Sequence, residues 1–105
     1  MDKKKIRQLN QRLNRLLLKI GNIKPKELRR FAEACGYELL PGKREPTYKN
    51  RYLNTVPFLT IPDHSWGINK YTAKSVLMRI EGFIFEAEQI LDRQEEGSHD
   101  TGKIK

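Results

Sequence analysis

The sequence has few of the residues that build disulfides, metal sites and membrane spans. It contains one cysteine, Cys35, and two histidines, His64 and His99. A single cysteine excludes an internal disulfide, and this set of side chains is too small for a zinc site. No apolar run approaches the roughly 18 residues that a membrane span needs, and the N-terminus lacks the pattern of a secretory signal. We therefore expect a soluble cytoplasmic protein without a metal or cofactor.

Common catalytic motifs are missing as well. There is no glycine-rich phosphate loop, Ser-His-Asp order or dinucleotide fingerprint, which argues against nucleotide-dependent enzymes and the common hydrolases. Positive charge is in excess, with 21 Lys and Arg against 13 Asp and Glu and a net charge of +8. The excess lies in residues 1–30, whereas residues 79–105 are net acidic. The chain therefore suits a polyanionic partner, and its two ends either attract each other or leave one basic face free.

Apolar periodicity predicts two helices in the first third of the chain. The first covers residues 3–20, and its apolar residues at heptad spacing are Ile6, Leu9, Leu13, Leu16 and Ile20. The second begins near Pro25, where a missing amide costs nothing, and ends at Gly36. Cys35 completes the apolar face of this helix, which predicts a buried and inert thiol.

A third helix is predicted near the end of the chain. It begins around Tyr71 or Thr72, and either Asn69 or Thr72 is suited to the N-cap position. Its apolar period continues to about residue 91. From Glu95 onward the sequence has no period and few apolar groups, which predicts a disordered tail over residues 95–105.

Three extended segments lie between the second and third helices. They cover residues 37–40, 47–52 and 56–61, and turn residues separate them, which favours an antiparallel meander. The middle segment has two alternating faces, one with Thr47, Lys49 and Arg51 and the other with Tyr48, Asn50 and Tyr52. The pairing register decides which of these faces is turned outward.

Helices and strands are segregated along the chain, which is typical of an α+β domain. One sheet face is expected to pack on the second and third helices. We assign residues 1–22 to a basic amphipathic helix, residues 23–94 to the main domain and residues 95–105 to the tail. The first helix is expected to pack back onto the domain or to pair in a homodimer; lying on an anionic membrane is the remaining alternative.

Residues 24–80 resemble the HicA family, the toxin half of HicAB toxin–antitoxin systems. The similarity lies in the order of three motifs: "KPKELRRFAEACGYEL", then "TIPDH", then "NKYTAKSVLMRI". The resemblance implies a small α-β-β-β-α fold like a double-stranded RNA-binding domain, to which the first helix is an addition. It also implies RNA binding, metal-independent cleavage of messenger RNA in active members, and an acidic antitoxin as partner.

One family feature is missing from this sequence. The family's proposed catalytic histidine lies between the first two strands, but the equivalent stretch here is "PGKREPTYKN", which has no histidine. Metal-free RNA cleavage needs a base for the 2′-hydroxyl proton and a cation for the developing charge. Glu45 is the candidate base, with Lys43 or Arg44 as the cation. The competing interpretation is a solvated charged turn, which short charge clusters usually form.

His64 and Trp66 lie in the segment before the third helix. His64 matches a position where the family often has a histidine, so it is either a phosphate contact or catalytic group, or a loop residue with no chemical role. Trp66 is either a hydrophobic plug or a base-stacking platform.

Four further basic residues are candidates for phosphate contacts: Lys49, Arg51, Lys70 and Lys74. Recognition of double-stranded RNA depends on shape and on phosphate and 2′-hydroxyl contacts, so scattered cations are sufficient. The expected function is therefore a HicA-like toxin that binds messenger RNA and is a candidate endoribonuclease. The alternative is a catalytically inactive RNA-binding or protein-interaction module with the same fold.

Overall fold

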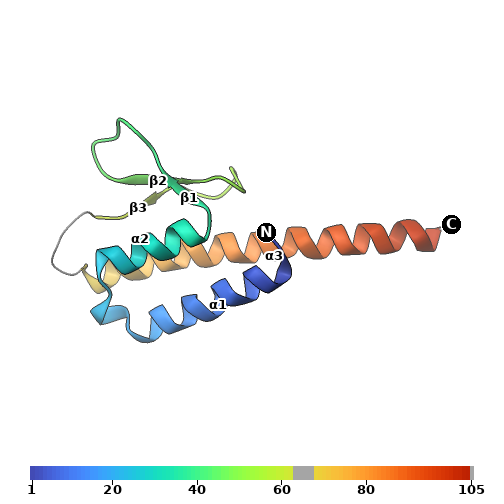
Figure 1. Cartoon of the computed structure of the whole chain (residues 1–105), viewed down its shortest axis with the longest axis horizontal. Helices are drawn as coiled ribbons and strands as arrows, with labels where there is room; N and C mark the ends of the chain where they lie inside the picture. Colours follow the sequence, from blue (N-terminus) through green and yellow to red (C-terminus); the bar gives the residue numbers. More distant parts are fainter. Residues whose placement is uncertain (63–67, 105) are drawn as a thin grey trace.

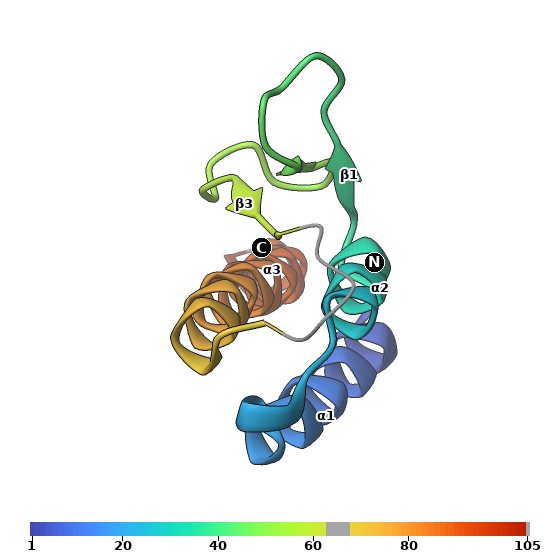
Figure 2. The ribbon, with the colours of Figure 1, turned by 90° about the vertical axis from the view of Figure 1, so that its left-hand side faces the viewer.

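The structure, a computed structural model of the chain, describes residues 1–62 and 68–104, the last ten as backbone only. Its elements are α1 (Lys3–Leu18), a 3₁₀ helix η1 (Ile20–Asn22), α2 (Pro25–Ala34), β1 (Tyr37–Leu39), β2 (Thr47–Asn50), β3 (Leu59–Thr60) and α3 (Lys70–Ile104). The fold is α+β, with a three-stranded antiparallel sheet in the order β1-β2-β3, as predicted. Figures 1 and 2 show the sheet on one side of α2 and α3 and α1 on the other side.

Helix α1 shares the core of the domain. Its N-cap is Asp2, whose Oδ1 accepts a hydrogen bond of 2.8 Å from the backbone N of Lys5. The apolar stripe turns inward, burying Ile6, Leu9 and Leu13 as α1 packs antiparallel to α3 (Figure 1). The helix therefore packs back onto its own domain, and its apolar stripe is occupied within the chain.

Helix α2 begins and ends where the sequence predicts. Pro25 stands at its first position, and Glu27 Oε1 accepts a hydrogen bond of 3.1 Å from the backbone N of Lys24. Gly36 follows the helix with a φ of 92°, a conformation that favours glycine. A Cβ at Gly36 would also overlap the ring of Tyr52. This glycine is therefore required by both conformation and space.

The sheet register decides which face of β2 is buried. Asn50 pairs with Tyr37, Lys49 with Glu38, and Tyr48 with Leu39. Tyr48 and Asn50 turn toward the helices and are buried, whereas Lys49 is exposed on the outer face. Lys49, the basic residue of this strand, therefore lies on the outer face.

Strand β3 is shorter than the predicted segment 56–61. Only Leu59–Thr60 pairs with β2. Pro57 has no backbone N–H to donate, which limits pairing on its side. The neighbouring carbonyl of Phe58 instead accepts a hydrogen bond of 2.8 Å from Arg79 Nη1 of α3. A helix side chain thus takes the place of a ladder partner at this end of the sheet.

Helix α3 starts at an asparagine cap and is longer than predicted. Asn69 Oδ1 accepts a hydrogen bond of 2.7 Å from the backbone N of Tyr71, so Asn69 is the residue that caps this helix. The helix continues to Ile104, through the segment that the sequence predicts to be disordered. An established helix adds each further residue without a new nucleation cost, and this segment has no proline to stop it.

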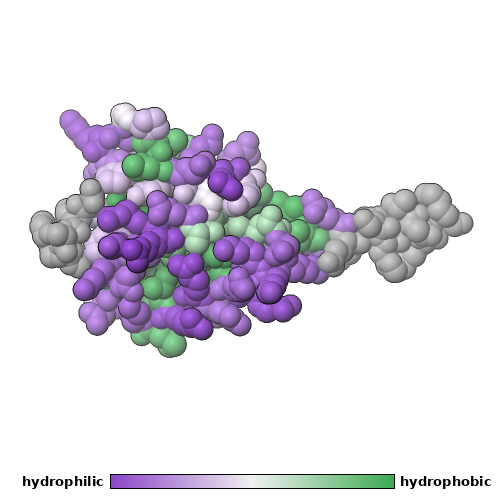
Figure 3. Space-filling view, viewed as in Figure 1, coloured by the Kyte–Doolittle hydropathy of each residue, from purple (hydrophilic) through white to green (hydrophobic). Residues whose placement is uncertain are grey.

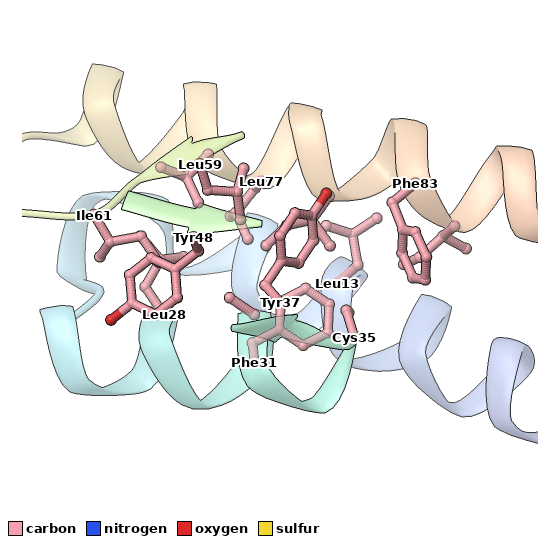
Figure 4. Packing of buried hydrophobic residues seen from close by; sticks show 14 of the residues in the cluster. Leu13, Leu28, Phe31, Cys35, Tyr37, Tyr48, Leu59, Ile61, Leu77 and Phe83 are labelled. Carbon is pink, nitrogen blue, oxygen red and sulfur yellow. The ribbon is translucent and has the colours of Figure 1, made fainter. Parts of the chain in front are cut away.

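The core lies between the sheet and the three helices (Figure 4). The ring of Tyr37 meets that of Phe83 edge to face, with centroids 5.9 Å apart. The largest fully buried side chains are Tyr37, Phe31, Phe83, Leu9, Leu13, Ile23, Leu28, Leu59, Ile61, Leu77, Ile80 and Cys35. Among the described residues, no helix has the length and apolar character needed to cross a membrane.

Candidate nucleic-acid interface

The loop between β1 and β2 forms one wall of a basic pocket. The loop projects away from the helices (Figures 1 and 2), and Gly42 adopts a φ of 73° in its turn. Its base is closed by a 2.8 Å hydrogen bond from Leu40 N to the carbonyl of Thr47. The pocket has a volume of about 560 Å³. We call it the loop pocket; it is lined by Arg29, Leu39, Leu40, Pro41, Gly42, Lys43, Arg44, Glu45, Pro46 and Tyr48.

The loop pocket combines cations from two separate elements. Arg29 comes from α2 and is half-buried, whereas Lys43 and Arg44 come from the exposed loop. Guanidinium- and ammonium-bearing residues that line one pocket suit a phosphate, which accepts several charge-assisted hydrogen bonds. The sequence identified Lys43 and Arg44 but missed Arg29. The α2 residue has no local motif, and only the packing of α2 beside the loop reveals it.

Glu45 lines the same pocket as the two loop cations. Thr47 Oγ1 donates a hydrogen bond of 3.0 Å to the backbone carbonyl of Glu45, which holds the loop backbone next to β2. The structure therefore brings together the proposed base and both proposed cations, Lys43 and Arg44. The Glu45 side chain is exposed to solvent.

The next two predicted residues lie in β2 and directly after it. Lys49 is exposed opposite Glu38. The guanidinium of Arg51 lies over the Tyr52 ring, 4.9 Å from its centroid, and Arg51 Nη2 donates a hydrogen bond of 3.1 Å to Tyr52 Oη. Tyr52 in turn stacks on Phe83, with ring centroids 6.5 Å apart. Arg51 is thus held in place by aromatic packing that begins in the core.

The predicted residues of α3 lie elsewhere. Lys70 is placed over the Tyr71 ring, 5.4 Å from its centroid, and Lys74 is exposed one turn later. Arg79 marks the side of α3 that faces the sheet, and Lys74 is rotated from it by roughly 140° around the helix. Lys74 therefore does not join the loop pocket. His64 and Trp66 fall within residues 63–67, outside the described residues.

A second basic pocket, which the sequence analysis did not identify, lies between α1 and α2. We call it the basic groove; its volume is about 350 Å³ and it is lined by Arg12, Arg15, Leu16, Lys19, Glu27 and Arg30. Lys19 Nζ and Glu27 Oε2 form an ion pair of 2.6 Å across it. The hydrogen bond from Lys19, followed by that from the Lys24 backbone, lowers the pKa of Glu27.

The basic groove and the loop pocket are connected through α2. Arg30 lines the groove and its neighbour Arg29 lines the pocket, so cations extend from α1 across α2 to the β1–β2 loop. This face is predominantly hydrophilic over α1 and α2 (Figure 3). At the far end of α1, Lys3 Nζ lies 3.3 Å from Asp92 Oδ1 of α3. An ion pair therefore joins the start of α1 to α3, and the two basic pockets lie away from it.

Two other chemistries receive no support from the described residues. Among the side chains that the structure describes, residues 1–62 and 68–94, no three of His, Cys, Asp or Glu gather as metal ligands would. Burial raises the pKa of the Cys35 thiol to about 12, so it is a protonated core side chain and not a nucleophile. No protein-family model matches the chain, and neither the curated proteins nor the solved structures searched include one similar to it.

Proposed function

We propose that this protein binds RNA through the basic face that extends from the basic groove across α2 to the loop pocket. The observation that carries the proposal is the loop pocket itself, where Arg29, Lys43 and Arg44 converge from two elements. A net charge of +8 supplies the long-range attraction to a polyanion. Lys49 adds a cation on the outer face of the sheet, and Arg51 adds another directly after β2.

The proposed recognition is of RNA shape and backbone. The order α2-β1-β2-β3-α3 is the order of a double-stranded RNA-binding domain, and the resemblance to HicA toxins supports the same assignment. Such domains contact phosphates and 2′-hydroxyls across an A-form helix and need no base-reading motif. The projecting β1–β2 loop is suited to enter a groove of the RNA.

Cleavage of the bound RNA is the second candidate function. Its specific support is that Glu45 shares the loop pocket with Lys43 and Arg44. In this reaction the carboxylate takes the 2′-hydroxyl proton, the 2′-oxygen attacks the phosphorus, and the 5′-oxygen leaves with a proton from solvent. The cations stabilise the charge on the phosphorus oxygens. The protein would then act as the toxin of a toxin–antitoxin pair, and an acidic antitoxin would cover the same basic face.

The test is incubation of the full chain with a structured messenger RNA in EDTA, scored for both gel retardation and cleavage. The double variant Lys43→Gln/Arg44→Gln should weaken binding at least about tenfold, and each lost phosphate contact should reduce the slope of log affinity against log salt by about 1. The control is Arg93→Gln, which removes one positive charge, half the change in the double variant, at a residue that lines neither basic pocket. Equal losses in the pocket variant and the control would overturn the proposed site.

Cleavage is tested in the same assay with Glu45→Ala and His64→Ala. Loss of cleavage with retained retardation in Glu45→Ala identifies the base in the loop pocket. Loss in His64→Ala alone assigns the base to the segment before α3. Retardation without cleavage in the unmodified protein supports an RNA-binding module that lacks the chemistry.

A further inference from the structure

Helix α3 carries a second apolar stripe, on the side away from the core. Tyr71, Met78 and Phe85 follow one another at intervals of seven residues, with exposed fractions of 72%, 38% and 57%. Gly82 lies in the same stripe, one turn after Met78. We call these four residues the α3 stripe. Figure 2 shows that no other described helix or strand covers the outer side of α3.

A hollow lies beside the middle of the α3 stripe, on the side of α1, because Asn10 of α1 is among its lining residues. A groove of about 400 Å³ is lined by Asn10, Met78, Glu81, Gly82, Ile84, Phe85 and Glu88. Four of these residues stand at positions i, i+3, i+4 and i+7 of α3. This is the arrangement that receives one side chain of a partner helix in knobs-into-holes packing. The four are Glu81, Ile84, Phe85 and Glu88. A Cβ at Gly82 would meet no atom within 4 Å, so the hollow is open at this glycine.

Charges beside the stripe are arranged in a self-complementary way. Lys74, Glu81 and Glu88 are also seven residues apart and form one column next to the stripe. Lys74 and Glu88 are separated by roughly 21 Å along the helix, too far to pair within one chain. In an antiparallel pair of α3 helices centred at Glu81 and Gly82, Lys74 of one copy faces Glu88 of the other. The two-fold axis generates this ion pair twice. Glu81 of one copy, in contrast, lies close to Glu81 of the other copy.

We propose that two copies of this chain associate through the α3 stripe as a two-fold antiparallel pair, with Met78 of each copy packed against Phe85 of the other and the two Gly82 residues facing each other near the axis. A second copy fits better than an unrelated helix because one stripe supplies the knob, the hole and both signs of charge, as an isologous interface requires. The contact is short, so the dimer is weak, with a dissociation constant in the micromolar range. The proposal does not depend on RNA binding, because the basic face lies on other elements.

The test measures the apparent mass of the full chain by sedimentation equilibrium at protein concentrations across the micromolar range. Unmodified protein should approach twice the chain mass as concentration rises, and Phe85→Asp should remain monomeric. Lys74→Glu and Glu88→Lys should each weaken association about tenfold or more, because each creates two like-charge contacts. The double variant Lys74→Glu/Glu88→Lys should return to near the unmodified affinity, and Glu81→Gln should tighten the dimer.

The control for charge is Glu33→Lys, an exposed position of α2 that should leave association unchanged. Circular dichroism verifies that each variant is folded, which is expected because the altered side chains are exposed. A monomeric unmodified chain at every concentration would overturn the proposal and leave the stripe to a different protein. A dimer in which the double charge exchange is as weak as either single exchange would overturn the antiparallel arrangement.

Discussion

At the scale of single residues, Asn50 is a buried polar side chain that holds three backbone groups in place. Its Nδ2 donates a hydrogen bond of 3.0 Å to the carbonyl of Cys35. Its Oδ1 accepts hydrogen bonds of 2.9 and 3.0 Å from the backbone N–H groups of Tyr52 and Leu53. One amide thus joins the end of α2 to the turn after β2, and it does so inside the core, where unpaired polar groups are costly.

Replacing Asn50 with alanine should lower the free energy of unfolding by about 3 kcal/mol, because three backbone groups lose their partner. Urea unfolding followed by circular dichroism measures the change. The matched control is Asn54→Ala, an exposed asparagine nearby, which should change stability by less than about 0.5 kcal/mol. Similar losses for both variants would contradict the structural role of Asn50.

Cys35 should behave as a buried thiol whose reactivity reports unfolding. Its pKa is raised from 9.0 to about 12 by burial, so the folded protein keeps the proton over a range where the unfolded chain loses it. The contribution of this group to stability is therefore complete below pH 9 and declines as the pH rises from 9 toward 12. A disulfide reagent at pH 8 should label native protein slowly and urea-unfolded protein at once. Rapid labelling of native protein would contradict the burial.

At the scale of elements, Gly82 and Gly36 should respond in opposite directions to alanine. Gly82 lies inside α3 with open space around it, so alanine should raise the free energy of unfolding by about 1 kcal/mol through helix propensity. Gly36 has a positive φ and the Tyr52 ring against it, so alanine there should be destabilising. Thermal unfolding at a concentration where the chain is monomeric measures both.

The same Gly82→Ala substitution should weaken self-association, because the added methyl groups would separate the two α3 helices where Gly82 of each copy lies near the two-fold axis. A variant that is both more stable and less dimeric separates the two roles of this glycine. Tighter association in the alanine variant would show that Gly82 does not lie near the two-fold axis.

The elements could be predicted well where local chemistry decides them. Heptad spacing located α1, and Pro25 and Gly36 bounded α2. For the N-cap of α3, the sequence offers two candidates, Asn69 and Thr72. Only the hydrogen bond from the backbone N of Tyr71 to Asn69 Oδ1 identifies Asn69 as the cap. Strand ends and the length of α3 were less predictable, since pairing partners and helix propagation depend on neighbours that a local pattern does not contain.

Only those residues of the candidate site that are consecutive in the sequence could be predicted. Lys43, Arg44 and Glu45 are consecutive, so the loop was visible in the sequence. Arg29 and the basic groove depend on how α1 and α2 pack, which charge patterning alone does not give. Conversely, the sequence groups Lys74 with Lys49 as candidate phosphate contacts. In the structure, Lys74 lies on a side of α3 that is turned away from the sheet, whereas Lys49 lies on the sheet.

At the scale of the whole molecule, α1 is part of the fold and not an appended arm. Leu9 is fully buried in the common core, so Leu9→Ala should lower the free energy of unfolding by about 3 kcal/mol. Leu18→Ala on the same helix is the matched control, because Leu18 is 89% exposed and should change stability little. The midpoints of urea unfolding are measured for both variants, and the Leu9→Ala midpoint should be the lower one. Comparable midpoints would mean that α1 is detachable from the core.

The edge strands of the sheet influence whether the protein aggregates at high concentration. Unpaired strand edges are templates for intermolecular β-pairing, the first step toward amyloid. Here β3 pairs over only two residues, Pro57 removes an amide donor beside it, and Arg79 already occupies the carbonyl of Phe58. This edge offers few free groups to another chain. A protein with such a blunted β3 edge can self-associate through a helix while this edge of the sheet stays closed to fibril growth.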